Sequence, residues 1–185
     1  MKKILIYLLF PAATLTLTSC MSSKTDSKRM AMEENKTKFP KDKCGDTRFA
    51  VCAADGGMLE VKLAELAQSN ASAASVKQFA KTMLESHTKA NAELKGLAAE
   101  KKISLPEKLS DKSQKTYDWL AKKQGADFDK AYMKCMVHDH KMDVCEFEKE
   151  VKKAKDPDLQ KWASGKVPVL KAHLDAAKIT CKELK

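Results

Sequence analysis

One stretch of the chain, from about Ser72 to Lys101, has its apolar side chains three and four residues apart over its whole length. This spacing is typical of one face of an α-helix, whereas the alternating pattern of β-strands is not found in the sequence. Ala, Leu, Lys, Glu and Met, which favour helices, dominate from Cys44 onward. The sequence therefore predicts an all-α domain with one core in the roughly 140 residues that follow Cys44.

Three further long helices and one short helix follow from the same spacing. The long ones are expected at about Thr47 to Ser69, at about Ala126 to Ala154, and from Asp156-Pro157 to about Leu184. The short helix, capped by Ser110 or Asp111 and containing Trp119, lies in the connection between the second and third long helices. The expected fold is a bundle of four long helices.

The N-terminus has the features of an export signal. Lys2 and Lys3 precede an apolar run of about 14 residues, which is too short to span a bilayer. The run ends in Leu17-Thr18-Ser19-Cys20, which resembles the lipobox of bacterial lipoproteins. We expect residues 1–19 to be a lipoprotein signal peptide, Cys20 to be lipidated, residues 20–43 to be a flexible tether and residues 44–185 to be the helical domain.

This anchor predicts a place in the cell envelope. Met21 stands where an Asp would resemble an inner-membrane retention signal, so we expect attachment to the outer membrane, facing the periplasm. The net charge of +10 comes almost entirely from Lys, with Arg29 and Arg48 as the only arginines. Together with export, this excludes nucleic acid as an expected partner, and the sequence indicates no particular protein partner.

Three of the four histidines interrupt apolar stripes. His87, His140 and His173 fall near the middle of the second, third and fourth long helices, and Glu60 falls near the middle of the first. Side chains at the same height on facing helices build metal sites in bundles. The sequence therefore predicts a layer of three imidazoles and one carboxylate that binds zinc, iron, manganese or copper. His138 should point away from this layer, because two residues turn a helix by about 200°.

Sulfur atoms favour copper within that set of metals. Met58, Met83 and Met136 lie within one turn of the predicted ligands and are candidate accessory ligands, although each is also an ordinary core residue. A metal-free layer is the alternative, in which hydrogen bonds from Glu60, Asp143 and Tyr132 satisfy the three rings.

Several phrases of the sequence together resemble a bacterial envelope family known only as a domain of unknown function. They are Ala53–Val61, Val76–Met83 followed by His87–Asn91, Phe128–Tyr132, His140 and Leu170–Leu174. The family is often described as outer membrane proteins and is placed in the ferritin-like superfamily. The resemblance implies a ferritin-like four-helix bundle with a crossover between the second and third long helices, and it implies no activity. The usual Asp-His pair of the family reads Ser86-His87 here.

Enzymatic activity is not expected. A ferritin-like di-iron site needs Glu-x-x-His pairs, but Leu84, Cys135, Val137 and Leu170 stand three residues before the four histidines. The sequence also has no phosphate-binding glycine loop and no zinc-spaced cysteines. Two functions remain: a lipid-anchored envelope protein that holds one metal ion, or a metal-free structural or stress-related envelope protein that acts through partner contacts.

Five cysteines follow Cys20, as expected of an exported chain. In the crossover topology Cys52 is level with Cys145, and Cys135 is level with Cys181, so we expect these two disulfides, with Cys44 either unpaired or competing for Cys52. A plain up-down-up-down bundle would leave Cys145 far from any partner.

Overall fold

The computed structural model describes residues 26–184, and within this range all regular structure is helical. The predicted all-α class is confirmed. No helix among these residues is both long and apolar enough to cross a membrane. The elements in chain order are α1 (Ser27–Lys38), the 3-10 turn η1 (Lys41–Lys43), α2 (Cys44–Asn70), α3 (Ala74–Glu100), α4 (Asp111–Ala121), α5 (Gly125–Lys153) and α6 (Pro157–Glu183).

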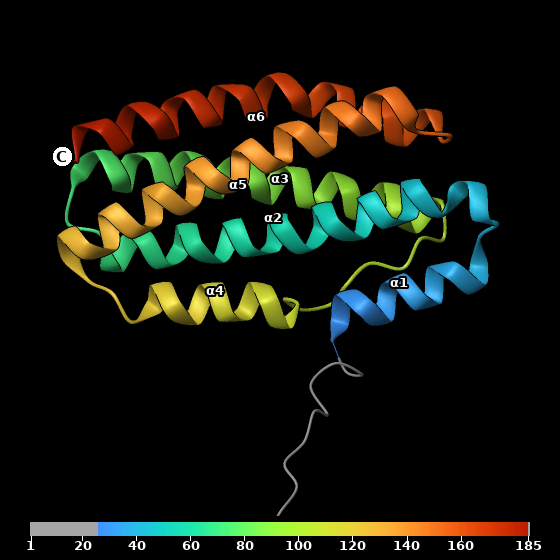
Figure 1. Ribbon diagram of the computed structural model, residues 1–185, viewed down its shortest axis with the longest axis horizontal. Helices are drawn as coiled ribbons and strands as arrows, with labels where there is room; N and C mark the ends of the chain where they lie inside the picture. The colour runs from blue at the N-terminus through green and yellow to red at the C-terminus, as the bar shows by residue number, and fades with distance from the viewer. Residues whose placement is uncertain (1–25, 185) are drawn as a thin grey trace, which may run out of the picture.

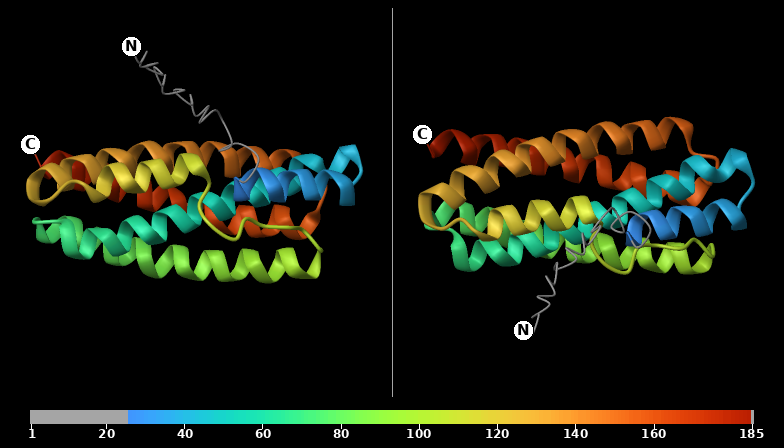
Figure 2. Two further views of the ribbon diagram at one scale, coloured as in Figure 1. Left: turned by 90° about the horizontal axis from the view of Figure 1, so that it is seen from below. Right: turned by 60° about the horizontal axis from the view of Figure 1, so that its bottom comes forward.

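The four long helices lie side by side along the length of the molecule (Figures 1 and 2). After α3 the chain returns along the bundle through the connection and α4, so that α3 and α5 run in the same direction (Figure 1). This parallel pair is the arrangement that the crossover predicts. The short helix begins as expected, because the Ser110 side chain accepts a hydrogen bond from the Ser113 backbone N–H at 3.2 Å.

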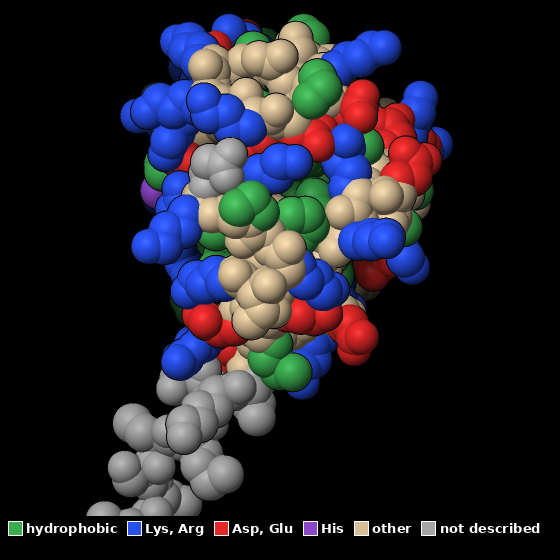
Figure 3. All heavy atoms as spheres, turned by 90° about the vertical axis from the view of Figure 1, so that its right-hand side faces the viewer, with side chains coloured by type: hydrophobic (Ala, Val, Ile, Leu, Met, Phe, Trp, Pro, Cys, Tyr) green, Lys and Arg blue, Asp and Glu red, His purple; other side chains and the backbone are tan. Residues whose placement is uncertain are grey.

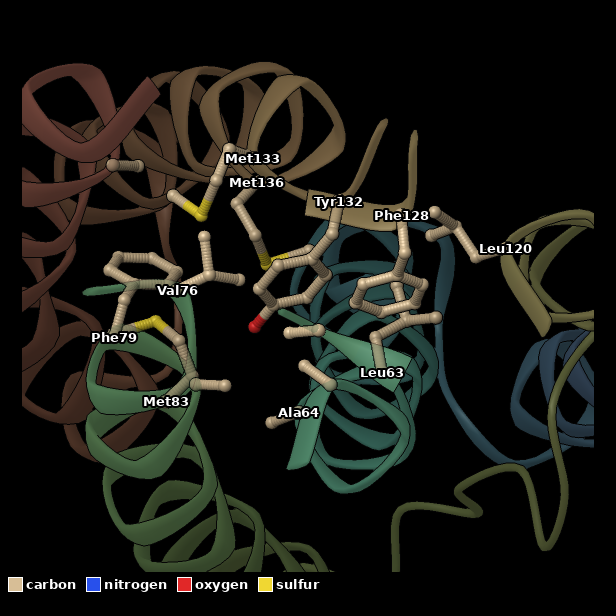
Figure 4. Close-up of a cluster of buried hydrophobic side chains, with 14 of the residues drawn as sticks. Leu63, Ala64, Val76, Phe79, Met83, Leu120, Phe128, Tyr132, Met133 and Met136 are labelled. Atoms are coloured by element: carbon tan, nitrogen blue, oxygen red, sulfur yellow. The ribbon is translucent and has the colours of Figure 1, made fainter. Parts of the chain in front are cut away.

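Two apolar regions fill the interior and leave a polar layer between them. The larger region includes Leu63, Phe79 and Phe128 in one half of the bundle (Figure 4). Two smaller clusters, with Leu94 and Leu159 in one and Phe147 and Leu170 in the other, fill the opposite half. Along α3 the apolar residues Met83 and Leu94 flank His87, which places a buried polar side chain between the two halves of the core.

Buried aspartates hold the turns between helices. Asp46, Asp55 and Asp129 are each less than 5% exposed, and each accepts backbone N–H groups from a connection distant in sequence. The donors are Lys155 and Asp156 for Asp46, Ser110 for Asp55, and Ser72 and Ala73 for Asp129. Because these N–H groups flank helix starts, the carboxylates also oppose the positive ends of helix dipoles.

The structure differs from the expected flexible tether over residues 20–43 from Ser27 onward. Residues Ser27–Lys38 form α1, which packs against α2. Asn35 is buried and makes two hydrogen bonds of 2.8 Å with the backbone of Ser104. Polar contacts of this kind leave no apolar stripe in the sequence, so helix periodicity could not predict α1. The expected signal peptide, the expected lipidation site Cys20 and the start of the expected tether lie outside the described residues.

The two predicted disulfides are also wrong for this structure. Cys44, Cys52, Cys135, Cys145 and Cys181 are all free. Cys52 and Cys145 are exposed, and Lys28 of the unpredicted α1 lies beside the Cys52 thiol. Cys135 and Cys181 pack against the same core cluster, but the Cys135 thiol donates to the Asp139 carboxylate at 3.1 Å. A shared level predicted from the sequence does not by itself bring two sulfur atoms within bonding distance.

Candidate metal centre

The buried polar layer is formed by one residue from each long helix. Glu60 comes from α2, His87 from α3, His140 from α5 and His173 from α6, and all four are buried. The structure therefore brings together the four residues that the sequence placed at one level. His138, two residues from His140, is exposed on the outside of α5, as expected.

The three imidazoles are close enough to share an ion. Their ring centroids are 5.4 to 5.5 Å apart, and one ring nitrogen from each histidine lies within 4.8 Å of the others. A point therefore exists at most about 2.8 Å from all three nitrogens, compared with about 2.0–2.1 Å for a zinc–imidazole bond. Small rotations of the side chains would complete the coordination.

Glu60 lies beside the histidines and orients one of them. Its Oε2 is 2.7 Å from His87 Nδ1, and its Oε1 is 3.4 Å from His140 Nδ1. The carboxylate accepts the Nδ1 proton of His87, a contact that fixes the tautomer and ring direction of many metal-bound histidines. Glu60 Oε1 is buried and has no hydrogen-bond partner, so this oxygen remains free for an ion.

Three ring nitrogens in the layer are buried without a hydrogen-bond partner. They are His87 Nε2, His140 Nε2 and His173 Nδ1. His140 Nδ1 lies 3.0 Å from the carbonyl oxygen of Met136, which can only accept, so the lone pair of His140 is on Nε2. His87 has the same tautomer because of Glu60. Leaving such groups buried and unpaired costs about 1–3 kcal/mol each, and an ion at this position would remove that cost.

The charge state of the rings also suits a cation. Burial, together with repulsion from the other two rings, lowers the pKa of His173 to about 4. Burial likewise lowers the pKa of His140. For His87 burial acts in the same direction, but the Glu60 carboxylate outweighs it and raises the pKa. At neutral pH at least two imidazoles are therefore neutral, the form that binds metals.

The remaining predicted residues do not contact the rings through hydrogen bonds. The hydroxyl of Tyr132 is buried without a partner, and neither Tyr132 nor Asp143 bonds to a histidine within the described part of the chain. Met83 and Met136 are buried in the larger apolar cluster (Figure 4). Met58 packs against that cluster. Their role as accessory ligands stays a prediction.

A cavity of about 220 Å³ adjoins the layer. Glu60, His87 and His173 form part of its wall, and Asp143, Trp162 and Lys166 are among the other lining residues. Sequence reasoning missed this cavity. The one sequence feature that pointed to the cavity was the Gly56-Gly57 pair. Gly57 lines the cavity, and because it has no side chain it leaves room for Asn91 on α3.

The fold and this layer define an all-helical protein with a buried three-histidine cluster at the centre of a helical bundle. The chain belongs to the family called domain of unknown function DUF4142, whose model matches residues 30–179. No curated protein matches the sequence.

Two solved structures share the fold. "CopM in the Cu(II)-bound form" has a TM-score of 0.64 and 18% identity, over 76% of this chain and 97% of that chain. "CopM in the Cu(I)-bound form" has a TM-score of 0.63 and 18% identity, over 75% of this chain and 96% of that chain.

Proposed function

We propose that this protein binds one transition-metal ion, with copper as the first choice, through His87, His140 and His173. The main support is the set of three buried ring nitrogens that lack partners and belong to rings clustered within reach of one point. Glu60 positions His87 and offers its free oxygen as a fourth ligand. The two structures with the same fold are copper-bound forms of CopM, which supports the same kind of ion here.

Copper is favoured over the other candidates by the donor set. Imidazole suits zinc, iron and copper alike, but copper(II) binds such sites more tightly than zinc or iron(II). The metal-free alternative has no protein partner for one buried ring nitrogen on each of His87, His140 and His173. Neither Tyr132 nor Asp143 provides the hydrogen bonds on which that alternative depends.

The role that we propose is holding an ion, for storage, sequestration or sensing, and not catalysis. We further propose that the chain is a ferritin-like four-helix bundle, with α4 in the crossover, and that a lipid on Cys20 anchors it to the outer membrane, facing the periplasm. The parallel course of α3 and α5 supports the ferritin-like assignment (Figure 1). The lipobox-like sequence supports the anchor.

Elemental analysis of the purified chain, before and after titration with copper, tests the metal site. We expect one copper per chain for the wild type and for His138→Ala, whose side chain is exposed. His173→Ala should lose most of the binding, because it removes one of the three imidazole ligands. Equal copper contents in His173→Ala and His138→Ala would contradict the site, as would a wild type that binds no metal of any kind.

A further inference from the structure

The outer surface of α4 has a stripe of basic side chains around one tryptophan. Lys112, Lys115, Trp119 and Lys122 are all exposed, and at 100° per residue they fall within an arc of about 80°. None of the three lysines forms a salt bridge among the described residues. These four residues are called the α4 stripe below.

Trp119 in the α4 stripe is unusual for a water-facing residue. It is 50% exposed, and Lys123 Nζ lies 4.7 Å from its ring centroid. Met30 on α1, which lies next to α4 along the same edge of the molecule, is 57% exposed (Figures 1 and 2). Exposed Trp with Lys around it is the composition of surfaces that lie in the headgroup region of a bilayer.

The described chain begins beside this stripe. The Asp26 carboxylate accepts a hydrogen bond of 2.7 Å from the backbone N–H of Asp111, the first residue of α4. A lipid on Cys20 would be separated from Asp26 by a chain that spans at most about 20 Å. The long helices are about 40 Å in length. A chain that leaves the fold at the start of α4 therefore brings the α1 and α4 edge close to the anchoring membrane.

We propose that the α4 stripe and the adjoining part of α1 lie on the surface of an anionic lipid bilayer, an inference that rests on the lipid anchor in the proposed function. Each Lys near an anionic surface adds attraction of about 1 kcal/mol, and the Trp ring suits the interface. The end of the molecule seen in Figure 3 has acidic and basic side chains interspersed. The bundle lies along the membrane and does not stand on its end.

Fluorescence quenching by lipids brominated on their acyl chains tests this orientation. The lipidated chain is placed in vesicles of phosphatidylcholine and phosphatidylglycerol. The protein has two tryptophans, so Trp162→Phe reports on Trp119, and Trp119→Phe reports on Trp162 at the cavity. We expect strong quenching in Trp162→Phe and little in Trp119→Phe. Equal quenching of both variants, or quenching of Trp162 alone, would overturn the proposal.

A second measurement separates this surface from the anchor. The chain with Cys20→Ala is sedimented with the same vesicles and with neutral phosphatidylcholine vesicles. Replacing Lys112, Lys115 and Lys122 by Gln should weaken binding to the anionic vesicles by at least about tenfold. The matched control replaces Lys81, Lys95 and Lys161 by Gln. These lysines are exposed on α3 and α6, and their replacement changes the net charge by the same amount.

The outcomes distinguish a failed surface from a failed anchor. Binding of the Cys20→Ala chain that depends on the α4 stripe supports the surface even if mass spectrometry finds Cys20 without lipid. Equal losses of vesicle binding in the two triple variants would overturn the proposed surface, because the attraction would then not depend on the α4 stripe. Concentration-dependent self-association that vanishes in Trp119→Phe would also overturn it, by making a second copy the partner of this face.

Discussion

Among single residues, His138 and His140 show how strongly position on a helix decides the role of a side chain. They have the same chemistry and the same helix, but His140 is fully buried in the polar layer and His138 faces solvent. The angle between them could be calculated from the sequence, and so could the common level of Glu60, His87 and His173. The contact between Glu60 and His87 could not, because it depends on the rotamers of both side chains.

Substituting the two histidines separately should give unequal results. His140→Ala leaves a cavity and removes a neighbour of Glu60, so we expect a loss of about 1–3 kcal/mol in unfolding free energy. If copper is bound, the loss should be larger with copper than with chelator. His138→Ala should leave the unfolding free energy unchanged, both with copper and with chelator. Thermal melts of both variants with copper or chelator measure this, and small, equal shifts would rule out a structural role for the layer.

Glu150 should make stability depend on pH. Burial, with repulsion from Asp46, raises its pKa from 4.5 to about 7. The folded state therefore binds the proton more tightly than the unfolded state, and stability falls as the pH rises from about 4.5 through 7. Glu150→Gln should then stabilise the protein at pH 8 by on the order of 1 kcal/mol and have a smaller effect near pH 4.

Melting temperatures across this pH range check the expectation for Glu150. Glu65→Gln is the control, because Glu65 is an exposed glutamate on α2. If Glu150→Gln raised the melting temperature by the same amount near pH 4 and at pH 8, the ionised carboxylate would not be what destabilises the fold.

At the level of elements, the apolar stripes predicted the four long helices to within about three residues at each end. Stripes report only the contacts that apolar side chains make. They could not predict α1, because Asn35 and Asp26 attach it through hydrogen bonds to residues far along the chain. They also could not predict that the five described cysteines are free.

The glycine pair on α2 provides a test of how closely α2 and α3 approach. A Cβ at Gly57 would overlap the side-chain amide of Asn91, whereas a Cβ at Gly56 would meet nothing within 4 Å. Gly57→Ala should cost about 1–3 kcal/mol. Gly56→Ala should stabilise by up to about 1 kcal/mol, because alanine favours helix. Urea unfolding of both variants decides this, and a gain in Gly57→Ala would show that Asn91 moves aside freely.

For the whole molecule, the resemblance to a ferritin-like family implied the crossover, and the structure has the parallel α3 and α5 that it requires (Figure 1). The cavity beside the histidines was not predictable, because its shape depends on the packing of side chains from several helices. The attachment of the molecule to a membrane rests on the sequence alone.

Replacing Cys20 should release the protein from membranes. The lipobox-like sequence that ends at Cys20 makes the lipid the expected main attachment. We expect Cys20→Ala to move to the soluble fraction at high salt, where attraction between the α4 stripe and lipid is screened. Fractionation of cells at high salt measures this. A variant that stays wholly in the membrane pellet would exclude the lipid as the anchor.

The cysteines of the described chain are free, so no covalent link joins its helices. An ion held by His87, His140 and His173 would be a removable cross-link between α3, α5 and α6, strengthened by Glu60 from α2. Loss of the ion would raise the population of opened forms, and proteases cleave in proportion to that population. The supply of metal would thereby set the lifetime of the protein, with the empty form degraded first.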